Sequence, residues 1–90
     1  MKTLEHTFLV QNSLGLHARP ATVIAQSLQS FHARVTFSCN SLTVDAKQVM
    51  SLLLLEATKD TLVCIKVEGV DADLALEKLL STIENLFKEN

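Results

Sequence analysis

Residues 15–21, Gly-Leu-His-Ala-Arg-Pro-Ala, combine residue types that suit phosphoryl chemistry at the start of a helix. The first turn of a helix leaves backbone N–H groups without intrahelical partners, and the aligned peptide dipoles add about half a positive charge, so this position attracts anions. With His17 at the N-cap, the free donors are on Ala18 and Arg19, whereas Pro20 has no N–H and holds φ in a helical range. The pattern predicts a site that holds a phosphoryl group beside an imidazole.

His17 is the predicted nucleophile of this site. A neutral imidazole can attack phosphorus at cytosolic pH, and the positive start of the helix favours the unprotonated ring. The adduct would carry about two negative charges, which the helix start and the planar guanidinium of Arg19 offset. Gly15 supplies the backbone freedom for a tight loop beside the ring. The residues alone leave the alternative that His17 only caps the helix and that Arg19 is solvated.

The hydrophobic pattern predicts the elements that position this site. Apolar and polar residues alternate with the period of a strand in four segments: 4–10, 33–39, 42–44 and 62–68. A two-residue turn, Asn40-Ser41, makes the middle two strands a hairpin. Apolar residues recur at helical spacing in three segments: 18–30, 46–56 and 72–88, the last of which is capped by Asp71.

The resulting order, β-α-β-β-α-β-α, favours an α+β fold in two layers. A four-stranded antiparallel sheet with three helices on one face buries the apolar stripes and leaves the other face of the sheet in water. Ninety residues suffice for a single domain, 1–90, and are too few for two.

Composition excludes several classes of function. Eight basic and ten acidic residues leave no basic face for nucleic acid or an anionic membrane. The longest apolar run, 52–55, is too short for membrane insertion, and the N-terminal residues do not read as a signal peptide, so we expect a cytoplasmic protein. No residues share a metal-ligand spacing, so we expect neither a metal nor a cofactor. Cys39 and Cys64 are expected to be buried thiols, and His6 and His32 surface residues.

The segment 15–21 resembles the active-site signature of the HPr family, the histidine phosphocarriers of the bacterial phosphoenolpyruvate-dependent phosphotransferase system (PTS). A second stretch, 44–55, matches the place of that family's short second helix, and length and element order agree over essentially the whole chain. The resemblance implies an open-faced β-sandwich that is a carrier and not an enzyme, and that works as a monomer without a cofactor. It also implies that Enzyme I phosphorylates Nδ1 of His17, that Arg19 stabilises the phosphoryl group, and that an enzyme IIA domain receives it for sugar uptake.

The helix predicted over 46–56 has more apolar residues than one buried face needs. The family docks its partner proteins through this helix and the start of the first one. The resemblance therefore implies a partner interface at four residues: Thr22, Val49, Met50 and Leu53. A flexible methionine suits a surface that fits more than one partner. Two alternatives stay open, namely that these residues belong to the core beside Leu52 and Leu55, or that Met50 marks a homodimer seam.

Three positions depart from the family pattern. Gln48 occupies the place of a serine that is phosphorylated for regulation in many Gram-positive members, so we do not expect that modification here. Glu56 and Asp60 replace glycines after the second helix, and we expect a different turn in which Asp60 and Thr61 supply side-chain hydrogen bonds. The stretch 52–56 is more similar to the nitrogen-related branch of the family. It favours an alternative function, a nitrogen-branch or regulatory protein that signals by docking to non-transport partners.

Overall fold

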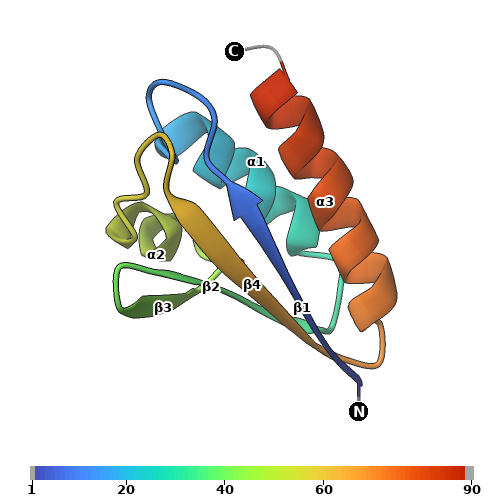
Figure 1. Ribbon diagram of the computed structural model, residues 1–90. Helices are drawn as coiled ribbons and strands as arrows, with labels where there is room; N and C mark the ends of the chain where they lie inside the picture. The colour runs from blue at the N-terminus through green and yellow to red at the C-terminus, as the bar shows by residue number, and fades with distance from the viewer. Residues whose placement is uncertain (1, 89–90) are drawn as a thin grey trace.

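The computed structural model of the protein describes residues 2–88. In chain order its elements are β1 (Lys2–Leu9), α1 (Ala18–Leu28), β2 (Arg34–Cys39), β3 (Leu42–Asp45), α2 (Val49–Leu54), β4 (Leu62–Gly69) and α3 (Ala72–Lys88). The strands form one antiparallel sheet in the order β1-β4-β2-β3. The helices cover one face of this sheet, with α1 in contact with both α2 and α3, and the other face is open (Figure 1). The predicted α+β open-faced β-sandwich is confirmed.

The hairpin between β2 and β3 has the two-residue turn that the sequence predicts. Asn40 and Ser41 have positive φ values of 52° and 65°, and Cys39 pairs with Leu42 across the turn. Positive φ at both central residues is the mark of a type I′ turn, whose twist matches that of the flanking strands. The short polar side chains at these two positions tolerate that backbone better than β-branched residues would.

Alternation along β4 separates the core from the open face. Val63, Ile65 and Val67 are buried beneath the helices. Phe8 of β1 packs edge-on against Phe37 of β2, with ring centroids 5.5 Å apart, and such a pair adds about 0.5–1.5 kcal/mol beyond its area burial. This packing fixes the sheet on which α1 lies, and with it the loop that leads from β1 into α1.

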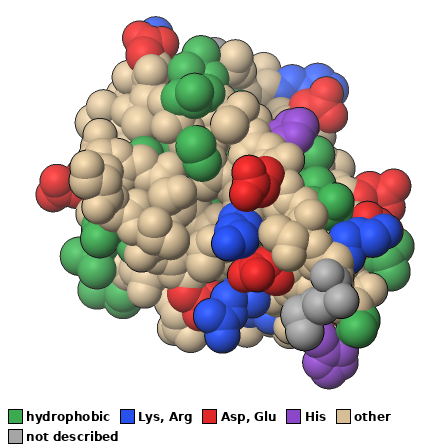
Figure 2. Space-filling view, turned by 60° about the horizontal axis from the view of Figure 1, so that its bottom comes forward, with side chains coloured by type: hydrophobic (Ala, Val, Ile, Leu, Met, Phe, Trp, Pro, Cys, Tyr) green, Lys and Arg blue, Asp and Glu red, His purple; other side chains and the backbone are tan. Residues whose placement is uncertain are grey.

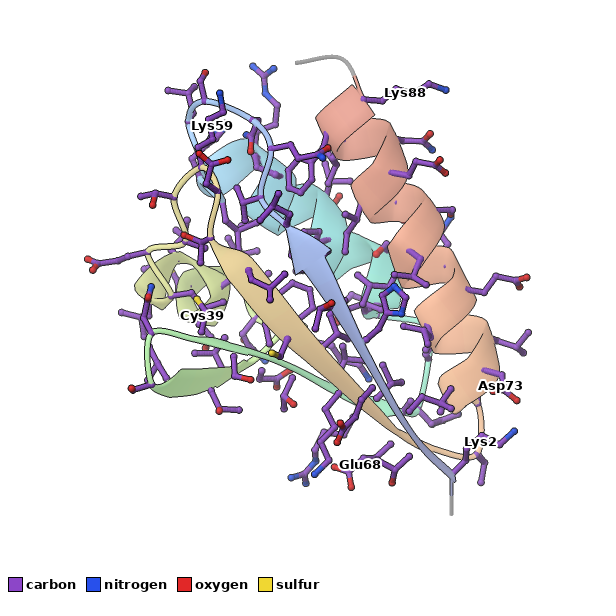
Figure 3. All side chains as sticks on the ribbon, in the orientation of Figure 1. Lys2, Cys39, Lys59, Glu68, Asp73 and Lys88 are labelled. Carbon is purple, nitrogen blue, oxygen red and sulfur yellow. The ribbon has the colours of Figure 1, made fainter. Side chains whose placement is uncertain are left out.

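Charged side chains gather on the open face and at the end of the molecule away from the β1–α1 loop. The strand register places Glu5 opposite Lys66 and Arg34 opposite Glu68. An ion pair joins Lys2 and Asp73 across 2.6 Å, and Figure 3 shows both side chains together at the lower end. Figure 2 views that end and shows acidic and basic side chains next to one another. Opposite charges there largely offset each other.

The helix α2 is shorter than the helix predicted over 46–56. The Asp45 carboxylate accepts the backbone N–H of Lys47 at 2.9 Å, and the N–H of Ala46 donates to the carbonyl of Val35 at 2.9 Å. These bonds extend the strand pairing through residue 46 and hold the next residue in a turn. The helix therefore begins only at Val49.

Asp71 precedes α3 as predicted, but its side chain does not cap that helix. Its backbone carbonyl accepts the N–H of Ala75 at 2.9 Å, whereas its carboxylate oxygens accept the backbone N–H groups of His32 and Ala33, each at 2.8 Å. The bond from His32 is the main cause that lowers the pKa of the Asp71 carboxyl. The side chain thus ties the start of α3 to the connection between α1 and β2.

The expectation of two buried thiols is wrong for Cys64. This residue lies on the open face of β4 and is exposed, because its neighbours Val63 and Ile65 take the positions that point toward the helices. Cys39 is half-buried at the end of β2, and burial raises the pKa of its thiol. His6 and His32 are exposed, as predicted.

Candidate functional site

His17 is the N-cap of α1, as the sequence predicts. Its backbone is extended, with φ −90° and ψ −170°, and its carbonyl accepts the first helical bond from the N–H of Ala21 at 3.0 Å. Its imidazole makes no capping hydrogen bond and is half-buried. The ring is therefore neither sealed in the core nor committed to closing the helix, and a reacting group can reach it.

The first turn of α1 presents unused donors next to this ring. Within residues 2–88, no acceptor bonds the backbone N–H of Ala18 or Arg19, and no acidic side chain lies in the first turn to offset the helix dipole. Pro20 follows in a buried position and has no N–H to satisfy. Two free N–H groups at the positive end of a helix are suited to bind phosphoryl oxygens.

Arg19 adds a cation at the edge of this turn. Its side chain is exposed and forms no ion pair with any residue that the structure describes. The Thr22 hydroxyl donates to the carbonyl of Ala18 at 2.7 Å and is thereby occupied within the helix. No described residue holds the guanidinium in an ion pair, so it can turn toward an anion beside His17.

The loop before His17 is held by a second loop, which connects α2 to β4. The N–H of Leu16 donates to the carbonyl of Ala57 at 2.8 Å. Gly15 has φ +71°, and a Cβ atom there would lie 2.5 Å from the same carbonyl oxygen, so only glycine fits. The amide of Asn12, itself buried, donates to the carbonyl of Gly15 at 2.8 Å. These contacts fix the chain one residue before the imidazole.

Of the side-chain hydrogen bonds expected after α2, the one at Thr61 is present, because its hydroxyl lies 3.4 Å from that of Thr58. Glu56 and Asp60 have φ values of 51° and 74°, so both adopt the left-handed backbone that glycine would allow. Asp60 makes no side-chain hydrogen bond within the described part of the chain; its backbone N–H donates to the carbonyl of Val10 at 2.7 Å. The hydrogen bond to Val10, just after β1, holds the backbone of Asp60 in this conformation even though the residue is not a glycine.

The helix α2 separates core residues from surface residues within one apolar run. Leu52 and Leu55 are buried, as expected, whereas Met50 is 74% and Leu54 is 66% exposed. Val49 and Leu53 are half-buried and pack against the core. Of the predicted interface residues on this helix, Met50 therefore offers most of its side chain to a partner, and the other two offer part of theirs.

A model of a known protein family matches this chain along nearly its whole length. It is described as the PTS HPr component phosphorylation site and matches residues 4–85, which include His17 and α1. The chain belongs to the HPr family. As a member of that family, the protein is a phosphocarrier of the phosphotransferase system rather than a catalyst.

Individual members of the HPr family are similar over the full chain. The phosphocarrier protein HPr of Xylella fastidiosa strain 9a5c is 36% identical over 87 residues, which are 97% of this chain and 98% of that protein. The phosphocarrier protein NPr of Shewanella violacea is 34% identical over 89 residues, 99% of this chain and 98% of that one. A histidine-containing phosphocarrier protein from Mycoplasma superposes with a TM-score of 0.91 at 26% identity, covering 93% of this chain and 96% of its own.

Sequence analysis missed three exposed apolar residues in α1, α2 and the loop before α1: Leu14, Val23 and Leu54. Leu14 lies in the loop before His17 and is 74% exposed. Consecutive leucines have no periodicity, so nothing in the run 52–55 distinguishes the exposed Leu54 from its buried neighbours. The hydrogen bond between Leu16 and Ala57 was missed as well, because no local pattern indicates a contact between two loops so far apart in sequence.

Neither a metal site nor a membrane span is found in residues 2–88. These residues hold no group of three or more His, Cys, Asp or Glu side chains that could bind a metal ion. None of the helices in that range has both the length and the apolar character needed to cross a bilayer.

Proposed function

We propose that His17 is the residue of this HPr-family protein that carries the phosphoryl group, received from phosphorylated Enzyme I and passed to an enzyme IIA domain. The observation that carries the proposal is the position of His17 at the N-cap of α1, with its imidazole uncapped and the N–H groups of Ala18 and Arg19 free. In the transfer, Nδ1 of His17 attacks the phosphorus of the donor's phosphohistidine. The new N–P bond forms as the donor's N–P bond breaks. The His17 ring gives up its Nε2–H proton as it becomes phosphorylated, and the donor's leaving ring nitrogen takes up a proton, so both imidazoles end neutral.

The groups around His17 act on the charge of the phosphoryl group. The two backbone donors and the Arg19 guanidinium bind the oxygens of the phosphoryl group. These oxygens come closer to the carrier as the N–P bond to the donor histidine lengthens. These groups lie at the protein surface, where Arg19 is exposed, so they bind the phosphohistidine from one side and leave its other side open. The adduct is therefore stabilised enough to persist and remains open to a second imidazole, which takes the phosphoryl group by the same reaction in reverse.

Partner proteins dock on the face of α1 and α2 beside His17. Four residues of this face form the proposed interface: Thr22, Val49, Met50 and Leu53. Met50 supports the proposal most directly, because an exposed, flexible side chain of this size has no packing role in the isolated protein. Donor and acceptor use the same face in turn, so the complexes are small and short-lived. The carrier acts as a cytoplasmic monomer in this scheme, which sedimentation at micromolar concentration tests.

Two downstream roles are distinguished by the acceptor. Sugar uptake is the leading proposal, and the 36% identity to an HPr supports it. The 34% identity to an NPr supports the nitrogen branch, as does the stretch 52–56. Transfer from the phosphorylated chain to a sugar-transporter enzyme IIA domain and to a nitrogen-regulatory one decides between them. The acceptor that takes the group at the higher rate at equal concentration identifies the branch.

Labelling from phosphoenolpyruvate tests the carrier role. Purified Enzyme I and phosphoenolpyruvate labelled with ³²P should transfer label to the wild-type chain, and the adduct should be acid-labile and alkali-stable. The label should vanish in His17→Ala and persist in His6→Ala, because His6 is an exposed histidine on β1 outside the site. An unlabelled wild-type chain, or equal labelling of His17→Ala, would show that His17 is not the carrier residue.

A further inference from the structure

The helices that flank His17 carry almost no charge. Arg19 is the charged residue of α1, and α2 has none. The exposed or half-exposed side chains of the two helices are otherwise neutral, and the apolar ones among them include Val23, Met50 and Leu54. A face of this composition cannot attract a charged partner surface over a distance.

The residues at the rim of this face do not supply the missing charge. Lys47 precedes α2 and Glu56 follows it, while Lys59 and Asp60 lie in the loop that holds Gly15. Figure 3 shows Lys59 beside the β1–α1 loop. The Nζ of Lys47 donates to the carbonyl of Phe31 at 2.6 Å and is thereby directed away from α2. The segment 47–60 thus holds two basic and two acidic residues, and its net charge is zero.

We propose that the phosphoryl donor of this protein docks through an uncharged, apolar surface, and that the ionic contact of the complex is the one between Arg19 and the phosphoryl group in transit. This inference rests on the proposed function, since it concerns the partner of the same site. His17 borders the face, so a donor that brings phosphorus to the imidazole must cover part of α1 and α2. The apolar side chains of that face, Met50 above all, match a partner surface of the same character.

The absence of charge also selects against other partners. A donor with an acidic ring around its phosphohistidine would bury carboxylates against neutral side chains, which offer at most uncharged hydrogen bonds and compensate only part of the lost hydration. The electrostatic attraction of such a donor over a distance would find one basic residue on the two helices, Arg19. Discrimination by this carrier is therefore expected to come from shape and apolar contact, and association should respond little to salt.

A salt titration tests the inference on the wild-type chain. The probe is the Enzyme I of the same organism, charged with phosphoenolpyruvate, and the measurement is the second-order rate of transfer at rising sodium chloride. Docking with no charged contact besides that of Arg19 predicts a change of less than about threefold between about 50 and 500 mM, since screening acts on charge pairs alone. A larger fall overturns the inference while leaving the carrier role intact, and a chain that takes no label at all overturns both.

Matched charge variants test the partner surface directly. Gln26 and Ser30 are exposed on or just beyond α1, and they are converted together to lysine or together to glutamate, Gln26→Lys/Ser30→Lys and Gln26→Glu/Ser30→Glu. At about 150 mM salt, where screening limits each charge to its neighbourhood, the two variants should transfer at rates within about threefold of each other. Faster transfer by the lysine variant and slower transfer by the glutamate variant, beyond that margin, would reveal an acidic partner and overturn the inference.

Two controls keep these outcomes distinct. Thermal melting of both double variants should stay close to wild type, since both positions are on the surface. Glu77→Lys, on the exposed side of α3, gives the response to net charge alone.

Sedimentation tests whether a second copy of the chain covers the apolar face instead. A concentration-dependent dimer that Met50→Glu abolishes would overturn the assignment of this face to the donor.

Discussion

The backbone N–H of Leu16 donates to the carbonyl oxygen of Ala57 at 2.8 Å, and this bond ties the proposed phosphoryl site to the loop after α2. Gly15 lies against the same carbonyl with φ +71°, and Asn12 holds the other side of the turn. The orientation of His17 therefore depends on residues that never touch the phosphoryl group.

Gly15→Ala tests this connection. The new Cβ atom would meet the Ala57 carbonyl at 2.5 Å in a backbone conformation that alanine disfavours. We expect the free energy of unfolding, measured in urea, to fall by about 1–3 kcal/mol and phosphotransfer to slow. Ser13→Ala, at an exposed position in the same loop, is the control and should change neither quantity. A Gly15→Ala protein as stable and as active as wild type would show that the contact with Ala57 does not position His17.

Glu56 stores strain that substitution can release. Its φ of 51° disfavours any residue with a Cβ, so Glu56→Gly should raise the free energy of unfolding by about 0.5–1 kcal/mol, after the greater entropy of glycine in the unfolded chain is subtracted. Glu56→Ala keeps the Cβ and should give no such gain. Urea denaturation measures the free energy of unfolding of the two variants. Equal values for Glu56→Gly and Glu56→Ala would show that the backbone conformation of Glu56 is not strained.

Asp71 should make stability fall at acid pH. The backbone N–H groups of His32 and Ala33 lower the pKa of its carboxyl in the folded state. A lowered folded pKa contributes stability that is present above the unfolded pKa of about 4 and is lost as the pH falls through the folded pKa. Melting of wild type should therefore decline more steeply below about pH 4 than melting of Asp71→Asn, which is less stable near pH 7. Glu77→Gln, exposed on α3, is the control and should follow wild type.

Local sequence patterns predict some features of this protein, whereas contacts between distant segments decide others. Asn40-Ser41 was predicted as a turn because two short polar residues between alternating strands determine it locally. His17 was placed correctly because a helix start has a local signature in Pro20 and the residues around it. Asp71 was predicted to cap α3, yet it bonds His32 and Ala33, because a distant loop offered better donors. Local patterns cannot reveal such competition.

Arg19→Ala should separate phosphate binding from stability. The side chain is exposed, so its removal should change the free energy of unfolding by less than about 0.5 kcal/mol. Loss of a charge-assisted hydrogen bond of about 1.5 kcal/mol should slow transfer about tenfold. Arg19→Lys keeps the charge without the planar fork and should recover part of the rate. Rapid-quench kinetics with Enzyme I and a melting curve measure the two effects, and a melted Arg19→Ala domain would contradict a role confined to the phosphoryl group.

Met50 and Leu52 lie two residues apart on α2 and should respond oppositely to substitution. Met50 is 74% exposed, so Met50→Glu should leave melting nearly unchanged and weaken docking to Enzyme I, because a carboxylate would be buried against an apolar partner surface. Leu52 is fully buried, so Leu52→Ala should cost about 2–5 kcal/mol of stability through the cavity it leaves. Calorimetry of binding and of unfolding measures both variants. A large loss of stability in Met50→Glu would place Met50 in the core and remove it from the interface, whatever happened to the rate of transfer.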